Sequence, residues 1–71
     1  MRENLTNARK NKGFTQLELA NKLGITERHY QNLEAGTSGG SIKVWHELKQ
    51  LLHAKSIDWL LEQSDNNLSG K

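Results

Sequence analysis

Apolar residues recur three or four positions apart in five blocks of the chain, the spacing that places side chains on one face of an α-helix. The blocks predict helices at about 4–12, 16–23, 27–35 and 42–52, with a short fifth helix after Ser56. No block shows the sustained alternation of polar and β-branched residues that indicates a strand. The pattern therefore predicts an all-α fold in one domain over residues 1–62, followed by a polar tail over residues 63–71 that we expect to be flexible.

The same periodicity predicts which side chains face the core. These inward positions are Leu5, Ala8, Leu19, Ala20, Leu23, Tyr30, Leu33, Ile42, Trp45, Leu48, Leu51, Leu52, Ile57, Leu60 and Leu61. Trp45 lies within the apolar stripe of its helix and is expected in the core. Trp59 is either a core residue or part of a dimer contact, because aromatic side chains are enriched at protein interfaces.

The segment from Thr15 to Gly36 carries the signals of two short helices joined by one glycine turn. Thr15 is a helix N-cap, and Glu18 three residues later completes a capping box. Gly24 ends the first helix, because glycine tolerates the left-handed conformation, and Thr26 caps a second helix that starts at once in a new direction. Such a turn-linked pair of helices is the arrangement that presents a helix to the DNA major groove.

The second helix of this pair has a polar side with the chemistry of base recognition. Tyr30 and Leu33 define its buried side, so Arg28, Gln31 and Asn32 lie on or beside the opposite one. Arginine pairs with the N7 and O6 of guanine, whereas asparagine and glutamine pair with the N6 and N7 of adenine. An ordinary solvent-exposed helix face has a similar composition. The interpretation as a DNA-binding face is favoured because these residues lie on the second helix of a turn-linked pair.

Gln16 is the first helical residue after the Thr15 cap. Free backbone N–H groups and the positive end of the helix dipole meet a phosphate at such a position, and the glutamine side chain adds a donor. An ordinary solvent-facing residue at a helix start is the alternative interpretation.

Composition restricts the chemistry without identifying a partner. The chain has 71 residues, 34% of them hydrophobic, no cysteine and a net charge of +2. This material suffices for one helical core but not for a deep enclosed pocket, and it excludes disulfides, thiolate metal sites and thiol catalysis. No apolar run is long enough to span a bilayer and no signal peptide is evident, so we expect a cytoplasmic protein without a membrane partner.

No constellation of catalytic or ligand-binding residues is evident. The three histidines lack metal-ligand spacing, and the carboxylates are spread through helices with capping, pairing or solvent roles. The GTSGGS segment lacks the spacing of a phosphate-binding loop and is interpreted as a helix connector followed by the cap Ser41. We therefore expect no enzyme activity, no cofactor, no metal and no small-molecule ligand.

The motif TQ-x-x-LA-x-x-LGI, followed by the Leu33, Glu34 and Gly36 pattern, resembles the phage-repressor and Cro-like helix-turn-helix family, also called the xenobiotic response element family. The resemblance extends from about Leu5 to Leu61, and the combination of motifs is highly specific. It implies a compact five-helix bundle of the lambda-repressor-like type whose third helix enters the major groove. It also implies a homodimer on double-stranded DNA with a pseudo-palindromic operator.

Carried over by position, the resemblance makes Gln16 a backbone contact and Glu27, Arg28 and Asn32 groove-facing residues, to which helix geometry adds Gln31. A carboxylate at Glu27 is repelled by phosphates unless it accepts from cytosine N4 or pairs with Arg28. The family pattern also suggests that Arg9 and Glu34 form a structural ion pair.

The chain departs from the family pattern in two places. Between the third and fourth helices, where relatives often carry basic residues and a proline, Thr37 and Ser38 precede two glycines and offer backbone donors. Lys43 is either a remaining charge for a phosphate or an unpaired surface lysine. His53 stands where a helix-ending glycine is common. The sequence thus predicts a small transcriptional regulator of the repressor or Cro type. The alternative is a protein-interaction module, such as the antitoxin partner of a toxin, with weak or secondary DNA binding.

Overall fold

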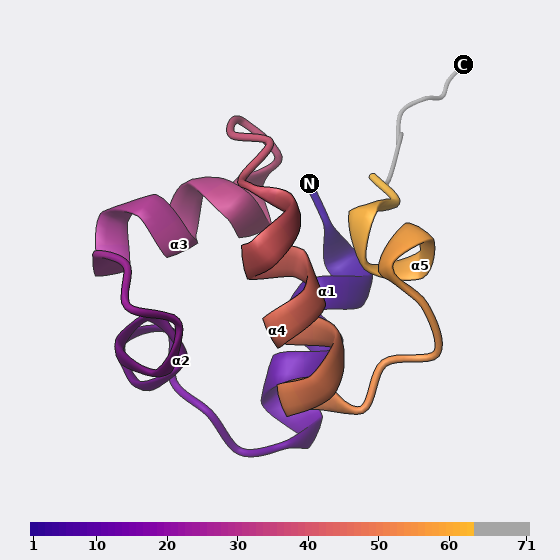
Figure 1. Ribbon diagram of the computed structural model, residues 1–71, viewed down its shortest axis with the longest axis horizontal. Coiled ribbons are helices and arrows are strands. Elements are labelled where there is room, and N and C mark those ends of the chain that lie inside the picture. The colour runs from indigo at the N-terminus through magenta and orange to yellow at the C-terminus, as the bar shows by residue number, and fades with distance from the viewer. Residues whose placement is uncertain (64–71) are drawn as a thin grey trace.

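The computed structural model describes residues 1–63, and within them five helices follow one another without a strand (Figure 1). They are α1 (Glu3–Asn11), α2 (Gln16–Leu23), α3 (Glu27–Ala35), α4 (Ile42–Leu52) and α5 (Ile57–Leu61). This confirms the predicted all-α fold, and the bounds of α2, α3 and α4 are those predicted. Helix α1 begins and ends one residue earlier than expected. Apart from Gln63, the predicted tail lies outside the described residues.

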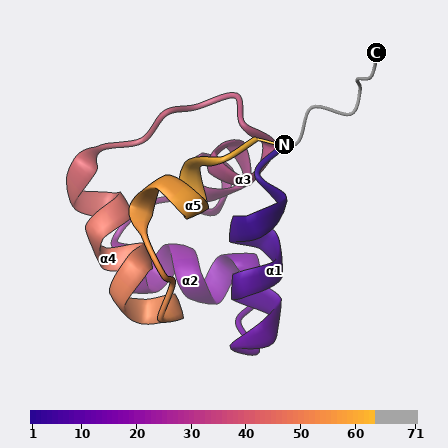
Figure 2. The same cartoon turned by 90° about the vertical axis from the view of Figure 1, so that its right-hand side faces the viewer.

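The core lies where the helices converge. Helix α2 packs against α3 and α4, and α1 packs against α3 and α5. Helix α5 lies across α1 and α4 and closes that side of the bundle (Figure 2). Side chains with no exposed surface are Leu5, Leu19, Ala20, Tyr30, Leu33, Leu48 and Leu60. All of them were predicted to face inward.

Helix α4 corrects one predicted core position. Trp45 is 2% exposed, as expected, but Ile42 is 71% exposed. The buried stripe of α4 runs through Val44, Trp45, Leu48 and Leu52. At about 100° per residue, Ile42 lies roughly 100° from the centre of that stripe. Trp59 packs half-buried against the core, and its predicted alternative as a dimer contact stays a prediction.

The connection from α4 to α5 depends on a residue in a rare conformation. His53 follows α4 with φ 53°, so a histidine holds the left-handed position that glycine usually takes. Its Nδ1 lies 3.0 Å from Nζ of Lys12, the residue directly after α1. The Ser56 hydroxyl then accepts from the Trp59 backbone N–H at 3.0 Å and starts α5 where the sequence predicted it. None of the helices in residues 1–63 combines the length and the apolar character needed to cross a bilayer.

Candidate nucleic-acid interface

Helix α2 begins with the predicted capping box. The Glu18 backbone N–H donates to Thr15 Oγ1 at 3.0 Å, and the Thr15 N–H donates to Glu18 Oε1 at 2.8 Å. Both bonds satisfy donors that a helix start leaves unpaired. Gln16 is thereby held as the first helical residue, where it is half-buried and contacts α3 through Glu34 and Gln31.

The turn from α2 to α3 is built from three consecutive residues. Gly24 has φ 73° and lets the Ile25 N–H donate back to Ala20 O at 3.0 Å. Thr26 then accepts from the His29 backbone N–H at 3.0 Å, so α3 starts directly after the turn. With Ala20 fully buried between the helices, α2 fixes the direction of α3.

The predicted groove-facing side chains lie on the outer side of α3. Glu27, Arg28 and Gln31 are exposed, while Asn32 is half-buried. Tyr30 and Leu33, on the inner side, are fully buried. The predicted division of α3 into an inner apolar side and an outer polar side is therefore the observed one.

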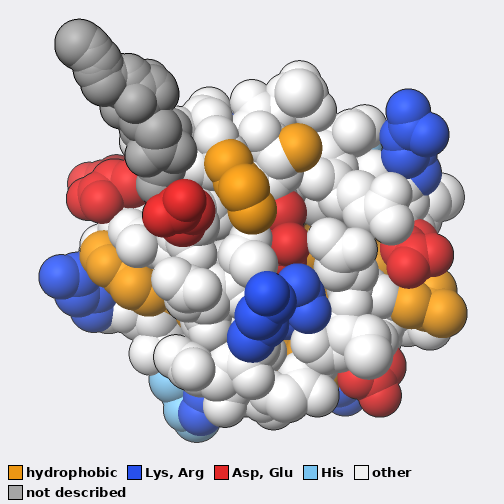
Figure 3. All heavy atoms as spheres, turned by 180° about the vertical axis from the view of Figure 1, so that it is seen from behind, with side chains coloured by type: hydrophobic (Ala, Val, Ile, Leu, Met, Phe, Trp, Pro, Cys, Tyr) orange, Lys and Arg blue, Asp and Glu red, His pale blue; other side chains and the backbone are white. Residues whose placement is uncertain are grey.

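The outer side of α3 carries one acidic and one basic side chain, Glu27 and Arg28, beside the neutral amides of Gln31 and Asn32. Within residues 1–63, Glu27 and Arg28 form no ion pair with each other, so of the two conditions that would let Glu27 face the groove, pairing with Arg28 is not seen. On the face shown in Figure 3, basic side chains alternate with acidic and uncharged ones and do not form a continuous stripe. This face therefore lacks the continuous basic stripe that usually marks a phosphate-binding surface.

The loop between α3 and α4 is tied to distant parts of the chain. Ser38 O accepts from Arg2 Nη1 at 2.8 Å, and Gly39 O accepts from Trp45 Nε1 at 2.6 Å. The exposed Thr37 stays close to α3, because its N–H donates to Asn32 O at 3.1 Å. The backbone that is predicted to meet DNA beyond α3 is thus held in one place.

Gly40 brings this loop against the core. Its φ is 68°, and an added Cβ would lie 2.8 Å from Leu33 Cδ2 and 3.1 Å from Trp45 Nε1. Only glycine fits this conformation and this close approach. Lys43, in the first turn of α4 beyond the Ser41 cap, is exposed and makes no ion pair within residues 1–63.

Arg2 is a structural residue that the sequence did not reveal. It is 6% exposed, and its Nη1 also donates to Leu33 O at 2.8 Å. Its Nε donates to Leu61 O at 3.3 Å, and its guanidinium lies 5.1 Å from the centre of the Trp45 ring. Burial lowers the pKa of Arg2. In sequence Arg2 is one of several basic residues near the start of the chain, and no local signal separates it from the exposed ones.

The predicted ion pair between Arg9 and Glu34 is present. Arg9 Nε donates to Glu34 Oε2 at 2.6 Å, and Arg9 Nη1 donates to Phe14 O at 2.8 Å. The Tyr30 hydroxyl donates to the same Glu34 oxygen at 2.6 Å. The other oxygen, Oε1, accepts from Gln16 Nε2 at 3.1 Å. The carboxylate of Glu34, whose residue is 4% exposed, therefore joins α1, α2 and α3.

These contacts decide the charge of the cluster. Burial raises the pKa of Glu34, but hydrogen bonds from Arg9, Tyr30 and Gln16 outweigh it, so the net pKa is lowered. The hydrogen bond to Glu34 raises the pKa of Arg9 despite its burial. Burial, together with the hydrogen bond to Glu34, raises the pKa of Tyr30. At neutral pH the cluster holds one carboxylate, one guanidinium and one neutral phenol.

The structure brings together two of the predicted site residues that sequence spacing could not connect. Gln31 Nε2 of α3 donates to Gln16 Oε1 of α2 at 3.5 Å. Gln16 therefore stands between the buried Glu34 and the exposed Gln31. Its helix-start position was predicted, but its bond to Glu34 was not, because the two residues are 18 positions apart.

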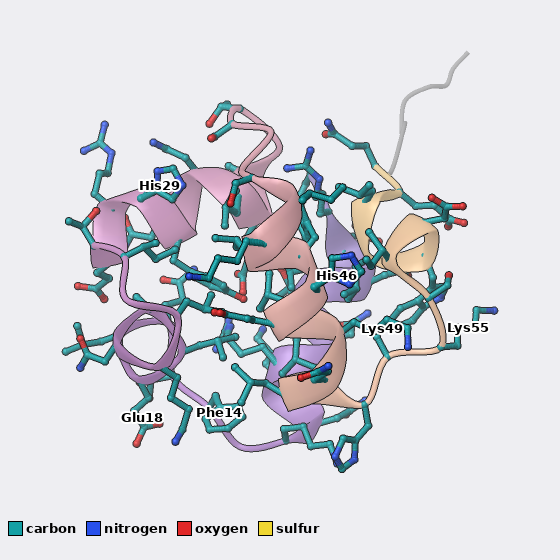
Figure 4. All side chains as sticks on the ribbon, in the orientation of Figure 1. Phe14, Glu18, His29, His46, Lys49 and Lys55 are labelled. Atoms are coloured by element: carbon teal, nitrogen blue, oxygen red, sulfur yellow. The ribbon has the colours of Figure 1, made fainter. Side chains whose placement is uncertain are left out.

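In the part of the chain that the structure describes, neither a metal-ligand group nor the groove near α1 involves the predicted DNA contacts. Within residues 1–63, no three His, Cys, Asp or Glu side chains form a group that could hold a metal ion. His29 and His46 are on different helices (Figure 4). A groove of about 450 Å³ is lined by residues of α1, the end of α4 and Trp59, and it includes none of the predicted DNA contacts.

Comparison with known proteins agrees with this geometry. A family model described as helix-turn-helix matches residues 5–60. The uncharacterized HTH-type transcriptional regulator YqaE of Bacillus subtilis (strain 168) is 38% identical over 64 residues, which are 90% of this chain and 54% of that relative. The chain therefore spans about half the length of this curated relative. No solved structure was found to match it significantly. The match over residues 5–60 confirms the predicted resemblance, and the chain belongs to the helix-turn-helix family.

Proposed function

We propose that this chain is a small DNA-binding transcriptional regulator whose helix α3 enters the major groove. The observation that carries the proposal is the capped α2–α3 pair, which buries Tyr30 and Leu33 and leaves Arg28 and Gln31 exposed on the outer side of α3. Membership of the helix-turn-helix family and the similarity to a protein named as a transcriptional regulator support it.

The side chains on α3 divide the reading of DNA between them. Arg28 offers two parallel donors suited to the N7 and O6 of guanine, and Gln31 and Asn32 each offer the donor and acceptor suited to adenine. Glu27, exposed at the start of α3, accepts from cytosine N4 if it reaches a base.

The residues around α3 bind the DNA backbone in this proposal. Gln16 meets a phosphate at the N-terminus of α2. Thr37 and Ser38 approach the backbone from the tethered loop, and Lys43 supplies a cation from α4. Each lost phosphate contact flattens the slope of log K against log salt by about 0.9.

The regulator acts as a homodimer on a pseudo-palindromic operator and represses by occupying it. It works in the cytoplasm, needs no cofactor or metal, binds no small molecule and catalyses no reaction. The alternative, a protein-interaction module such as an antitoxin, is not favoured by any feature of α3 and remains an outcome of the test below.

Selection of bound sites from a random double-stranded DNA library tests the proposal. We expect one enriched motif, with two half-sites about 34 Å apart if the dimer is two-fold symmetric. Recovery of no motif, together with no retention of genomic fragments at low salt, would contradict DNA binding and favour the interaction module.

Two substitutions then test the role of α3. Arg28→Ala and Asn32→Ala should each weaken binding to the selected site by about 1–3 kcal/mol and relax the preference at one base pair. Asn7→Ala and Lys55→Ala are controls, because both residues are exposed and Lys55 lies on the α5 side of the molecule, far from α3 (Figure 4). Binding is measured by gel shift or fluorescence anisotropy. Unchanged base preference in both α3 variants would refute the proposed recognition surface.

A further inference from the structure

We propose that Glu34 is a positioning residue for DNA recognition, which sets the orientation of the Gln16 side-chain amide and through it that of Gln31. The inference rests on the proposed function for its consequence at DNA, but the orientation itself exists in the free protein. It assigns to a buried ion-pair residue a second role beyond holding α1 to α3.

Three contacts form a continuous path from the core to the outer side of α3. Arg9 Nε and the Tyr30 hydroxyl both donate to Glu34 Oε2 at 2.6 Å. The other oxygen, Glu34 Oε1, accepts from Gln16 Nε2 at 3.1 Å and from Arg9 Nη2 at 3.5 Å. On the other side of the same amide, Gln16 Oε1 accepts from Gln31 Nε2 at 3.5 Å.

The negative charge of Glu34 determines which group of each amide donates and which accepts. An ionised carboxylate only accepts hydrogen bonds, so Gln16 must turn its NH₂ group, and not its carbonyl, toward Glu34. The carbonyl of Gln16 then points to Gln31, which must in turn present its own NH₂ group. Each amide has one allowed orientation as long as Glu34 carries its charge.

With these orientations, the amide groups that would contact DNA stay free on the outer side of α3. Gln31 uses one N–H on Gln16 and keeps its second N–H and its carbonyl, the donor and acceptor that match N7 and N6 of adenine. Gln16 uses one N–H on Glu34 and keeps its second one for a phosphate oxygen. A reversed Gln16 amide would offer a carbonyl to the phosphate and repel it.

The free protein provides the first test, by NMR of the side-chain amides. The two Nε2 protons of Gln16 should resonate away from those of Gln50, an exposed glutamine on α4 that serves as the internal reference. Glu34→Gln removes the charge at nearly constant shape and should move the Gln16 signals to the Gln50 positions. Tyr30→Phe removes a donor without touching Gln16 and should leave them displaced. Coincidence of the Gln16 and Gln50 signals in the native protein would overturn the proposal.

The second test is a double-substitution cycle on an oligonucleotide that carries the selected motif. Glu34→Gln should weaken binding about three- to tenfold when Gln16 is present, the range for the net value of one hydrogen bond. In a Gln16→Ala background the same change should cost less than about twofold, because the group through which Glu34 acts is gone. An equal loss in both backgrounds would show that Glu34 acts only through the fold and would overturn the proposal.

A second variant guards against unfolding. Glu34→Gln leaves the buried Arg9 without its charged partner, whereas Arg9→Met/Glu34→Met replaces both by apolar side chains, a change that buried ion pairs often tolerate. This variant should stay folded by circular dichroism and show the same loss of the Gln16 signal and of affinity. Retention of both would overturn the positioning role. If the native protein binds no DNA, the proposed function fails, and the amide signals alone decide the orientation.

Discussion

Helix α3 is flanked by two connections that are built in different ways. The turn before it, from Gly24 to Thr26, is held by bonds between residues at most five positions apart. The loop after it is held by side chains from other parts of the chain: Arg2 donates to Ser38 O across 36 positions and Gln63 Nε2 donates to Gly36 O across 27. The start of α3 is therefore a local property of the sequence, whereas the path of the backbone after α3 depends on the folded ends of the domain.

This difference has a consequence for DNA binding. The turn can form in any context that allows α2, because its caps and its glycine are self-contained. The loop has local bonds as well, but its bonds from Arg2 and Gln63 form only when α1 and α5 are docked, because Arg2 precedes α1 and Gln63 follows α5. In the proposed function, base reading by α3 and contact of the loop with the DNA backbone therefore have separate structural supports.

The largest effect should come from adding a methyl group to the loop. Gly40→Ala should lower the free energy of unfolding by about 2–4 kcal/mol, since it combines left-handed strain with contacts to Leu33 and Trp45 below normal packing distance. Gly24→Ala, whose Cβ would meet nothing within 4 Å, should cost only the strain, about 1–2 kcal/mol. Urea unfolding measures both. Equal losses would show that the loop is no more constrained than the turn.

Removal of the Arg2 side chain should cause the second largest loss of stability. Arg2→Leu leaves the carbonyls of Leu33 and Ser38 without their donor and should destabilise the protein by about 1–3 kcal/mol. Lys10→Leu, at an exposed position of α1, is the matched control and should change stability by less than about 0.5 kcal/mol. Thermal unfolding of the two variants gives the comparison. Similar melting temperatures would mean that the tether to the loop contributes nothing.

Loss of the α3 cap should have a smaller effect. Thr26→Ala removes the acceptor for the His29 N–H and should cost about 1 kcal/mol, while Thr26→Ser should restore most of it. Urea unfolding is again the measurement. A loss in Thr26→Ala larger than that in Arg2→Leu would reverse the ranking of the two connections.

Lowering the pH should have the smallest effect on stability near neutral pH, and the effect should grow as the pH falls further. Because the pKa of Glu34 is lowered in the folded protein, its contribution to stability is present above its ordinary pKa of 4.5 and is lost as the pH falls through the folded value. As the pH is lowered from neutral, the denaturant midpoint should therefore begin to decrease below about pH 4.5. The decrease should be smaller in Arg9→Met/Glu34→Met. The same decline in both proteins would assign it to other carboxylates.

The contrast between the two connections also explains what the sequence could predict. The caps at Thr15 and Thr26 and the stop at Gly24 were all predicted correctly, because each depends on residues a few positions away. The pairing of Arg9 with Glu34 was obtained from the family pattern and not from spacing. The tie of Arg2 to the loop was missed, since nothing near Arg2 distinguishes a buried guanidinium from a solvated one.

The remaining errors have the same origin. Ile42 was placed in the core because it continues the apolar spacing of α4, but the direction of that helix against its neighbours centres the buried stripe on Val44 and Leu48 instead. The bond between Gln16 and Glu34 depends on how closely α2 approaches α3, which local periodicity does not contain. The existence of each helix could thus be predicted from local periodicity, whereas contacts between helices could not, and the one predicted correctly came from the family pattern.

The carboxylate of Glu34 has one more consequence, for the way in which this bundle comes apart. Because Arg9 and Gln16 both meet Glu34, neither α1 nor α3 can move away alone without separating the buried ion pair, and departure of α2 takes a hydrogen-bond donor from the same carboxylate. Partial opening is thereby penalised relative to complete opening. The three helices should behave as one cooperative unit, and a recognition helix inside such a unit is either fully formed or absent.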